Sequence, residues 1–144
     1  MHITTRMLLV TALVAGAIPT KAGAVEVIVV VGANAPITSL TSAQVADIFL
    51  GRTVALPNGK TIVPIDQLEG STIRQEFYAK TTGKSPQLLK AHWSKLIFTG
   101  QGEPPREAPD SEAVKKLVAS NPSYIGYIER TAVDSTVKAV MAAR

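Results

Sequence analysis

The order of apolar and polar positions divides the chain into short strands separated by helices and turns. Residues 25–31 (VEVIVVV) form a valine-rich run that ends at Gly32, a pattern typical of a buried strand. Residues 61–65 (TIVPI) and 124–128 (YIGYI) predict two more strands, and residues 137–141 (VKAVM) a further one. The strands are short, and each is followed by residues that favour a turn or a helix.

The clearest helix is predicted to begin after Thr41, in the segment LTSAQVADIFLG. Thr41 and Gln44 have the spacing of a capping box, and Leu40 can pack onto Val45 as a hydrophobic staple. Gly51 suits the left-handed conformation in which many helices end. We therefore expect a helix with one apolar face and defined ends.

Three more helices are predicted downstream. One begins near Ser71 or Thr72 and ends at Gly83, and one is opened by Ser85 as the N-cap and Pro86 at the first helical position. Another lies between Asp110 and the Asn121-Pro122 stop. The helix after Ser85 is expected to bury an apolar face made of Leu88, Leu89, Trp93, Leu96 and Ile97.

Strands that alternate with helices at this spacing indicate an α/β fold with helices over a central sheet. Residues 100–109 (GQGEPPREAP) are rich in glycine and proline and are interpreted as a loop. Tyr124 and Tyr127 flank Gly126 and are interpreted as packing residues. In sheets of this kind, ligands bind at the carboxyl ends of strands beside helix N-termini.

Residues 1–24 have the pattern of a signal peptide. Arg6 precedes an uncharged stretch at residues 7–18, and Ala22-Gly23-Ala24 supplies small residues at a cleavage site before Val25. Twelve residues span roughly 18 Å as a helix, less than the ~30 Å hydrocarbon core, which argues against the alternative of an uncleaved anchor. We expect a mature domain at residues 25–144 and export to the periplasm.

Composition excludes several classes of function. The formal net charge of +4 falls to +2 when Arg6 and Lys21 leave with the leader, so a nucleic-acid surface is not indicated. The chain has no cysteine and two histidines, His2 and His92, which excludes thiolate chemistry and makes a metal site a poor prediction. No cofactor and no catalytic activity are expected.

The segment 66–72 (DQLEGST) is the strongest candidate site. It follows a predicted strand and opens a helix, so the N–H groups of Ser71 and Thr72 would lack partners within the helix. Those donors and the helix dipole favour an anion, and Gly70 lets the backbone approach it closely. The alternative is that Ser71 only caps the helix.

Other polar residues are weaker candidates. Asp66 with Glu69, or Glu103 with Glu107, has the composition of a carboxylate pair, but loop acids of this kind are expected on the surface. His92 lies one position off the centre of an apolar helix face and is interpreted as a half-buried packing histidine.

Three segments together resemble a known family. LTSAQVADIFLGR, DQLEGSTIRQEFY and SEAVKKLVASNPSYIGYIE stand in the order found in phosphate-binding proteins of ABC transporters. The resemblance is to the second lobe of that periplasmic binding-protein fold and covers roughly residues 25–140. It implies a single lobe with a central mixed sheet flanked by helices, without the glycine-rich first segment and the rest of the first lobe.

In that family the phosphate is gripped by a motif that reads approximately Arg-x-Asp-x-Ser-Gly-Thr. The resemblance places Gln67 at the arginine, Glu69 at the aspartate and Ser71 at the serine. Thr72 stands at the glycine and Ile73 at the threonine. Loss of the arginine removes a charge-assisted contact that a neutral amide does not replace.

The resemblance leads to the hypothesis of an exported solute-binding protein, or a shortened relative, for ABC-type uptake. Phosphate or a similar small oxyanion is its expected ligand, bound by Gln67, Glu69, Gly70, Ser71 and Thr72. An ABC transporter permease or a membrane sensor is its expected protein partner. The alternative is a ligand-free interaction module that docks to such a membrane or sensor protein.

Overall fold

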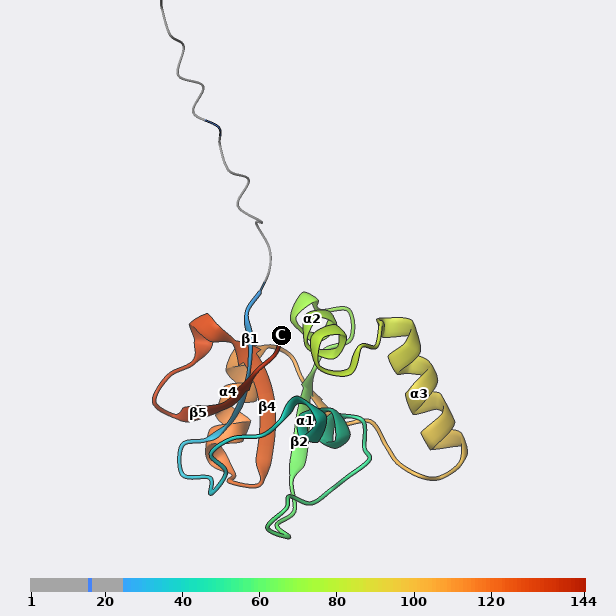
Figure 1. Ribbon diagram of the computed structural model, residues 1–144, viewed down its shortest axis with the longest axis horizontal. Helices are drawn as coiled ribbons and strands as arrows, with labels where there is room; N and C mark the ends of the chain where they lie inside the picture. The colour runs from blue at the N-terminus through green and yellow to red at the C-terminus, as the bar shows by residue number, and fades with distance from the viewer. Residues whose placement is uncertain (1–15, 17–24) are drawn as a thin grey trace, which may run out of the picture.

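The computed structural model describes Gly16 and residues 25–144, so the signal peptide predicted at residues 1–24 lies, apart from Gly16, outside the described residues. The described chain forms a sheet of five strands with helices on both faces (Figure 1). In chain order the elements are β1 (Val27–Gly32), α1 (Ser42–Phe49), β2 (Val63–Gln67), α2 (Thr72–Thr82), α3 (Pro86–Phe98), β3 (Arg106–Ala108), α4 (Ser111–Ser120), β4 (Tyr124–Glu129), a 3₁₀ turn (Arg130–Ala132) and β5 (Val137–Ala142).

The sheet is mixed, with the strand order β3-β2-β4-β1-β5. Strand β2 runs parallel to both β3 and β4, whereas β1 pairs antiparallel with β4 and with β5. The valine-rich strand β1 is buried along its whole length, as its sequence predicts. The α/β fold with a central mixed sheet flanked by helices is therefore confirmed.

The two faces of the sheet are covered by different helices. Alternate residues of β1 point to opposite faces, so Val29 packs in a core with α1 and α2, and Val30 packs in a core with α4. In Figure 1, α4 lies behind β1 and β4, and α1 and α2 lie on the other side of the sheet. Each face thus has its own apolar core.

The helix α3 lies to one side of the sheet in Figure 1, beyond α1 and α2. Leu89 and Trp93 are buried, as predicted, but Leu88 and Ile97 are each 56% exposed, which corrects the expectation that the whole apolar face is core. The reason is that α3 packs on the core through Leu89, Trp93 and the partly buried Leu96 only. His92 is half-buried as predicted, and its Nε2 lies 2.8 Å from the carbonyl oxygen of Leu50.

Two boundaries differ from the sequence-based prediction. Strand β2 begins at Val63 and continues through Asp66 and Gln67, which were expected in a loop. The predicted loop at residues 100–109 contains β3, which pairs with the end of β2. Among the described residues, none of the helices combines the length and the apolar character needed to cross a bilayer.

Candidate functional site

A tight turn connects the carboxyl end of β2 to the first residue of α2. The Ser71 N–H donates to the Leu68 carbonyl at 3.2 Å, and Gly70 has a φ of 87°. A positive φ at the third position of a turn favours glycine, and a side chain here would meet no atom within 4 Å. Gly70 therefore sets the direction of the chain and leaves open space beside the helix.

Ser71 is the N-cap of α2, which confirms the capping role that the sequence allows for it. Its Oγ accepts a hydrogen bond from the Arg74 N–H at 3.4 Å, and the hydroxyl keeps its own hydrogen as a donor. The N–H groups of Thr72 and Ile73 belong to the first turn, where the helix offers no acceptor. Thr72 is exposed, so solvent reaches this end of the helix.

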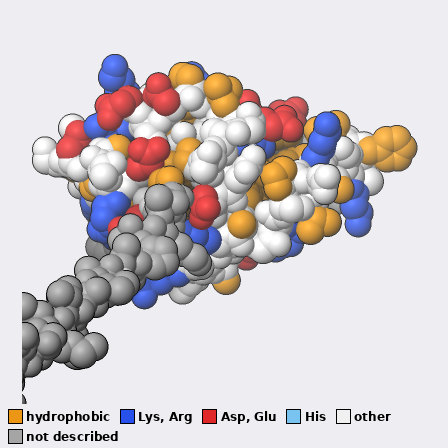
Figure 2. All heavy atoms as spheres, turned by 90° about the horizontal axis from the view of Figure 1, so that it is seen from above, with side chains coloured by type: hydrophobic (Ala, Val, Ile, Leu, Met, Phe, Trp, Pro, Cys, Tyr) orange, Lys and Arg blue, Asp and Glu red, His pale blue; other side chains and the backbone are white. Residues whose placement is uncertain are grey.

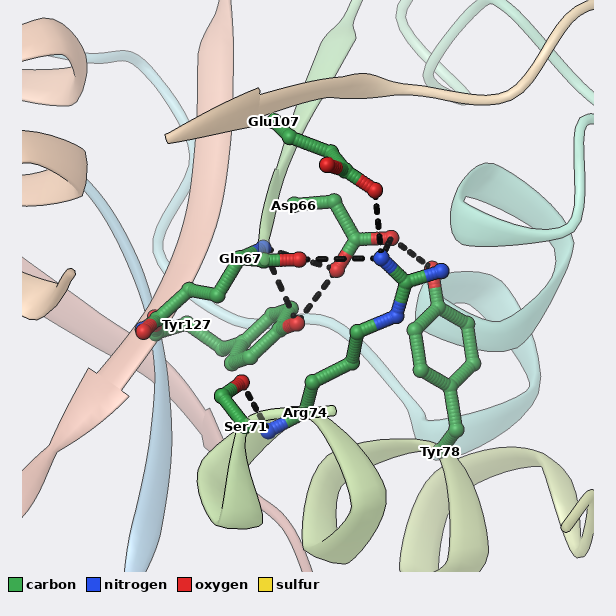
Figure 3. A network of polar contacts seen from close by, with 7 residues as sticks. All are labelled: Asp66, Gln67, Ser71, Arg74, Tyr78, Glu107 and Tyr127. Atoms are coloured by element: carbon green, nitrogen blue, oxygen red, sulfur yellow. Dashed lines mark hydrogen bonds and ion pairs between the residues drawn. The ribbon is translucent and has the colours of Figure 1, made fainter. Parts of the chain in front are cut away.

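The Gln67 side chain points away from Ser71, toward Tyr127 (Figure 3). It is 2% exposed, and its Nε2 donates to the Ser111 Oγ at 3.1 Å and to the Tyr127 carbonyl at 2.9 Å. Residues of a strand alternate between faces, so Gln67 turns to the α4 face. Glu69 is exposed in the turn beside Gly70. The structure thus brings Glu69, Gly70, Ser71 and Thr72 together, without the Gln67 amide.

Asp66 is buried, which corrects the expectation that it is a surface acid of a carboxylate pair. It is 1% exposed, and its Oδ2 accepts from the Tyr78 hydroxyl at 2.6 Å. Its Oδ1 accepts from the Tyr127 hydroxyl and, at 2.8 Å, from the Gln67 N–H (Figure 3). Three donors on one carboxylate satisfy a charge that would otherwise be costly to bury.

Burial controls the protonation of these groups. Removal from water raises the pKa of Asp66, although the charge of Arg74 and the bonds from Tyr127 and Tyr78 act in the opposite direction. Burial, together with the adjacent Asp66 carboxylate, also raises the pKa of Tyr78 and Tyr127 well above the usual tyrosine range. Both phenols therefore stay protonated and act as donors.

Arg74 places a positive charge beside the buried Asp66. Its guanidinium reaches back to the carboxyl end of β2, where Nη1 donates to the Gln67 carbonyl at 3.0 Å and to the Glu107 Oε1 at 2.7 Å. The same nitrogen lies 3.9 Å from the Asp66 Oδ2. The guanidinium also lies over the Tyr78 ring, 5.7 Å from its centroid.

Sequence reasoning missed the polar network of Asp66, Arg74, Tyr78, Glu107 and Tyr127. Its one local signal is the pair Asp66-Gln67 directly after the apolar residues of a strand, because strand ends are where polar groups gather in such sheets. Within the described residues, no group of three or more His, Asp and Glu side chains is placed to hold a metal ion.

Solved structures with the same fold give the site a context. A protein from Clostridium perfringens, described as a phosphate ABC transporter substrate-binding protein and solved with bound phosphate, matches at a TM-score of 0.64 with 26% identity. The match covers 81% of this chain and 44% of that one. The chain resembles one lobe of a phosphate-type substrate-binding protein.

A second match, at lower identity, supports the fold and nothing more. An ABC-type phosphate transport receptor from Vibrio cholerae also has a TM-score of 0.64, with 21% identity, over 81% of this chain and 46% of that one. The chain thus spans less than half the length of either protein. No protein-family model and no curated protein sequence matches it.

Proposed function

We propose that the chain is an exported solute-binding protein, or a shortened relative of one, that binds phosphate or a similar small oxyanion for ABC-type uptake. The observation that carries the proposal is the open first turn of α2 at the carboxyl end of β2. The resemblance to a protein solved with bound phosphate supports the choice of anion. No reaction is part of this function, because binding and release are sufficient for uptake.

The proposed anion is held by hydrogen-bond donors of the first turn. The N–H groups of Thr72 and Ile73 point out of the helix, and the hydroxyls of Ser71 and Thr72 add two donors. The helix dipole contributes about 0.3–1 kcal/mol, and Gly70 leaves the approach free of side-chain atoms. The Glu69 carboxylate accepts a hydrogen bond from a protonated phosphate oxygen.

Gln67 takes a supporting role in this proposal. Its amide holds the end of β2 against β4 and α4, and its carbonyl accepts from Arg74. Gln67 therefore fixes the position of the strand end from which the turn to α2 begins. Arg74 brings a positive charge to the same strand end, although Glu107 engages it in this structure.

The proposal includes export. Residues 1–24 act as a cleavable signal peptide, the domain from Val25 onward works in the periplasm, and an ABC transporter permease or a membrane sensor is its partner. N-terminal sequencing of the exported protein tests this part, since the chain is expected to begin at Val25. An exported chain that still begins at Met1 would show that the leader is not removed.

The binding site is tested by comparing Ser71→Ala with Ser85→Ala. Both serines are N-caps, with Oγ accepting at 3.4 Å from Arg74 and at 3.3 Å from Leu88, so each substitution is expected to lower the free energy of unfolding by about 1 kcal/mol. Loss of a hydroxyl that binds a charged acceptor costs ~1.5–3 kcal/mol, so only Ser71→Ala is expected to weaken phosphate binding, by roughly 10- to 150-fold.

Isothermal titration calorimetry with phosphate and with sulfate measures these affinities for the wild type and both variants. Equal weakening by Ser71→Ala and Ser85→Ala would assign the effect to helix capping alone. Flat titrations of all three proteins at millimolar anion would end the oxyanion hypothesis and favour the ligand-free interaction module.

A further inference from the structure

A cavity lies between α2 and α3, beside the turn that precedes α2. Its volume is about 220 Å³, below the ~300–1,000 Å³ of drug-sized sites, so it suits a small ligand. Glu69 and Gly70 form part of its wall, but Ser71 and Thr72 do not line it. The cavity is therefore adjacent to the first turn of α2 but separate from it.

One side of this cavity is apolar. Leu89, Trp93 and Ile97 line it from α3, and Ile97 is 56% exposed although the sequence predicts it in the core. Figure 2 shows hydrophobic side chains gathered at the end of the molecule that α3 occupies, with lysine and arginine side chains among them. An apolar group of a ligand that packed against Ile97 in the cavity would remove this apolar surface from water.

The other side of the cavity is polar, and its charge favours an anion. Three basic side chains line it, those of Arg74, Lys84 and Lys90, against the two carboxylates of Glu69 and Glu107. The Arg74 side chain is 13% exposed, and its guanidinium donates through Nη1 to the Gln67 carbonyl and to Glu107. A guanidinium has further N–H groups in a planar fork that matches carboxylate or phosphate oxygens.

Glu107 holds the position that an anionic ligand would take. Its Oε1 lies 2.7 Å from Arg74 Nη1, and its side chain is 42% exposed, so water can solvate the carboxylate when it leaves the guanidinium. An external carboxylate or phosphate that approaches Arg74 from the cavity therefore competes with a carboxylate of the protein itself.

Trp93 adds a donor that lacks a partner. Its Nε1 is buried and has no acceptor among the described residues, although buried polar atoms in native proteins are nearly always paired. Trp93 lines the cavity with other atoms of its side chain, because its Nε1 is shielded from solvent. Trp93 therefore contributes apolar surface to the cavity rather than a hydrogen bond.

We propose that this cavity binds a small organic anion, a phosphate or carboxylate that carries one apolar group. The anionic end contacts Arg74 in place of Glu107, and the apolar group packs on Leu89, Trp93 and Ile97. Inorganic phosphate fills the polar side only. The proposal differs from phosphate binding at Ser71 and Thr72, because it needs Leu89, Trp93 and Ile97 of α3, although Glu69 and Arg74 lie beside both sites.

Phenyl phosphate is the probe, and the fluorescence of Trp93, the single tryptophan of the chain, is the readout. The full chain is titrated with phenyl phosphate, with inorganic phosphate and with benzyl alcohol, which separate the anionic from the apolar contribution. We expect a saturable fluorescence change with phenyl phosphate and a much weaker response with the other two.

Two neighbouring residues of α3 supply a matched pair of variants. Ile97 lines the cavity, whereas Phe98 is 91% exposed and does not line it. Ile97→Ser is expected to weaken phenyl phosphate binding roughly three- to tenfold, and Phe98→Ser is expected to leave it unchanged. Glu107→Gln removes the competing charge and is expected to strengthen binding roughly two- to fivefold.

The outcomes decide between sites. Equal effects of Ile97→Ser and Phe98→Ser, equal binding of benzyl alcohol, or no saturable response to phenyl phosphate would each overturn the proposal. Ser71→Ala is expected to leave phenyl phosphate binding intact. If phenyl phosphate binds but calorimetry with inorganic phosphate shows no heat, the proposed function is refuted and this site is supported. If inorganic phosphate binds but phenyl phosphate gives no saturable response, this site is refuted and the proposed function is supported.

Discussion

The two faces of the sheet differ in what they bury. The α4 face is apolar at its centre, where Gly126 lies so close to the helix that a Cβ would come within 2.4 Å of the Val114 Cγ1. The opposite face contains an aromatic cluster in which Phe77 stacks on Tyr127 with ring centroids 3.9 Å apart. At the edge of that cluster the Tyr127 hydroxyl contacts the buried Asp66.

The α4 face of the sheet is packed with apolar side chains, whereas the polar network lies on the α2 face. The α4 face depends on close packing of small and branched side chains, which fixes the strands but offers no reactive group at its centre. The α2 face depends on a buried carboxylate whose partners come from β2, β4 and α2. Those partners place Arg74 and the first turn of α2 at one strand end.

Asp66→Ala is expected to have the largest effect and tests whether the polar network stabilises the α2 face. It leaves the hydroxyls of Tyr78 and Tyr127 without their acceptor, so the free energy of unfolding should fall by about 3–5 kcal/mol. Urea denaturation followed by circular dichroism measures it. Asp47→Ala is the control, because Asp47 is an exposed acid 3.4 Å from Arg52, and its loss should cost less than about 1 kcal/mol. Similar costs for both variants would refute a stabilising network.

Gly126→Ala is the corresponding test of the α4 face and is expected to have an intermediate effect. The new methyl group collides with Val114, and overpacking of this kind lowers the free energy of unfolding by about 1–3 kcal/mol. Gly102→Ala serves as the control, since a Cβ there meets no atom within 4 Å, and it should change stability by less than about 0.5 kcal/mol. A neutral Gly126→Ala would mean that α4 can shift away from the sheet.

The smallest expected effect is a pH dependence confined to the α2 face. Burial raises the pKa of Asp66 in the folded state above its unfolded value, so the folded chain holds the proton more tightly. The resulting stabilisation is complete below the unfolded pKa and is lost as the pH rises through the folded pKa.

Asp66→Asn removes this titration and provides the comparison. The stability of the wild type relative to Asp66→Asn should decrease as the pH rises from about 3 to about 7, as measured by urea midpoints. Gly126→Ala should show the same pH dependence as the wild type at a lower overall stability, because the titrating group is on the other face. A constant difference between wild type and Asp66→Asn would show that burial does not shift Asp66.

The elements that sequence predicted well are those whose partners are close in the chain. The capping box of α1 forms as expected, with the Thr41 N–H 2.9 Å from the Gln44 Oε1 and the Gln44 N–H 3.2 Å from the Thr41 Oγ1. Ser85 caps α3 in the same local way. Such contacts are fixed by three residues of separation, so their pattern is visible in the sequence.

The features that sequence missed depend on distant partners. Asp66 and Gln67 are polar and therefore look like loop residues in the sequence. They extend β2 because Tyr127 donates to the Asp66 carboxylate and Ser111 accepts from the Gln67 amide. The three residues of β3 are too few to show a period, and they pair only once β2 is in place. The exposure of Ile97 likewise follows from where α3 lies, which its own apolar spacing does not determine.

The pairing of the first and last strands, β1 and β5, brings the two ends of the described domain together. Ile28 is the register partner of Ala142, and the Ala143 N–H donates to the Val27 carbonyl at 2.9 Å, so both ends of the described domain leave the sheet side by side (Figure 1). Adjacent ends are the geometry that domain insertion and circular permutation require. A short linker can join them, and the chain can reopen at the exposed turn around Asn58 with every strand pair retained. The adjacent ends would therefore allow this lobe to be inserted into a single loop of another protein.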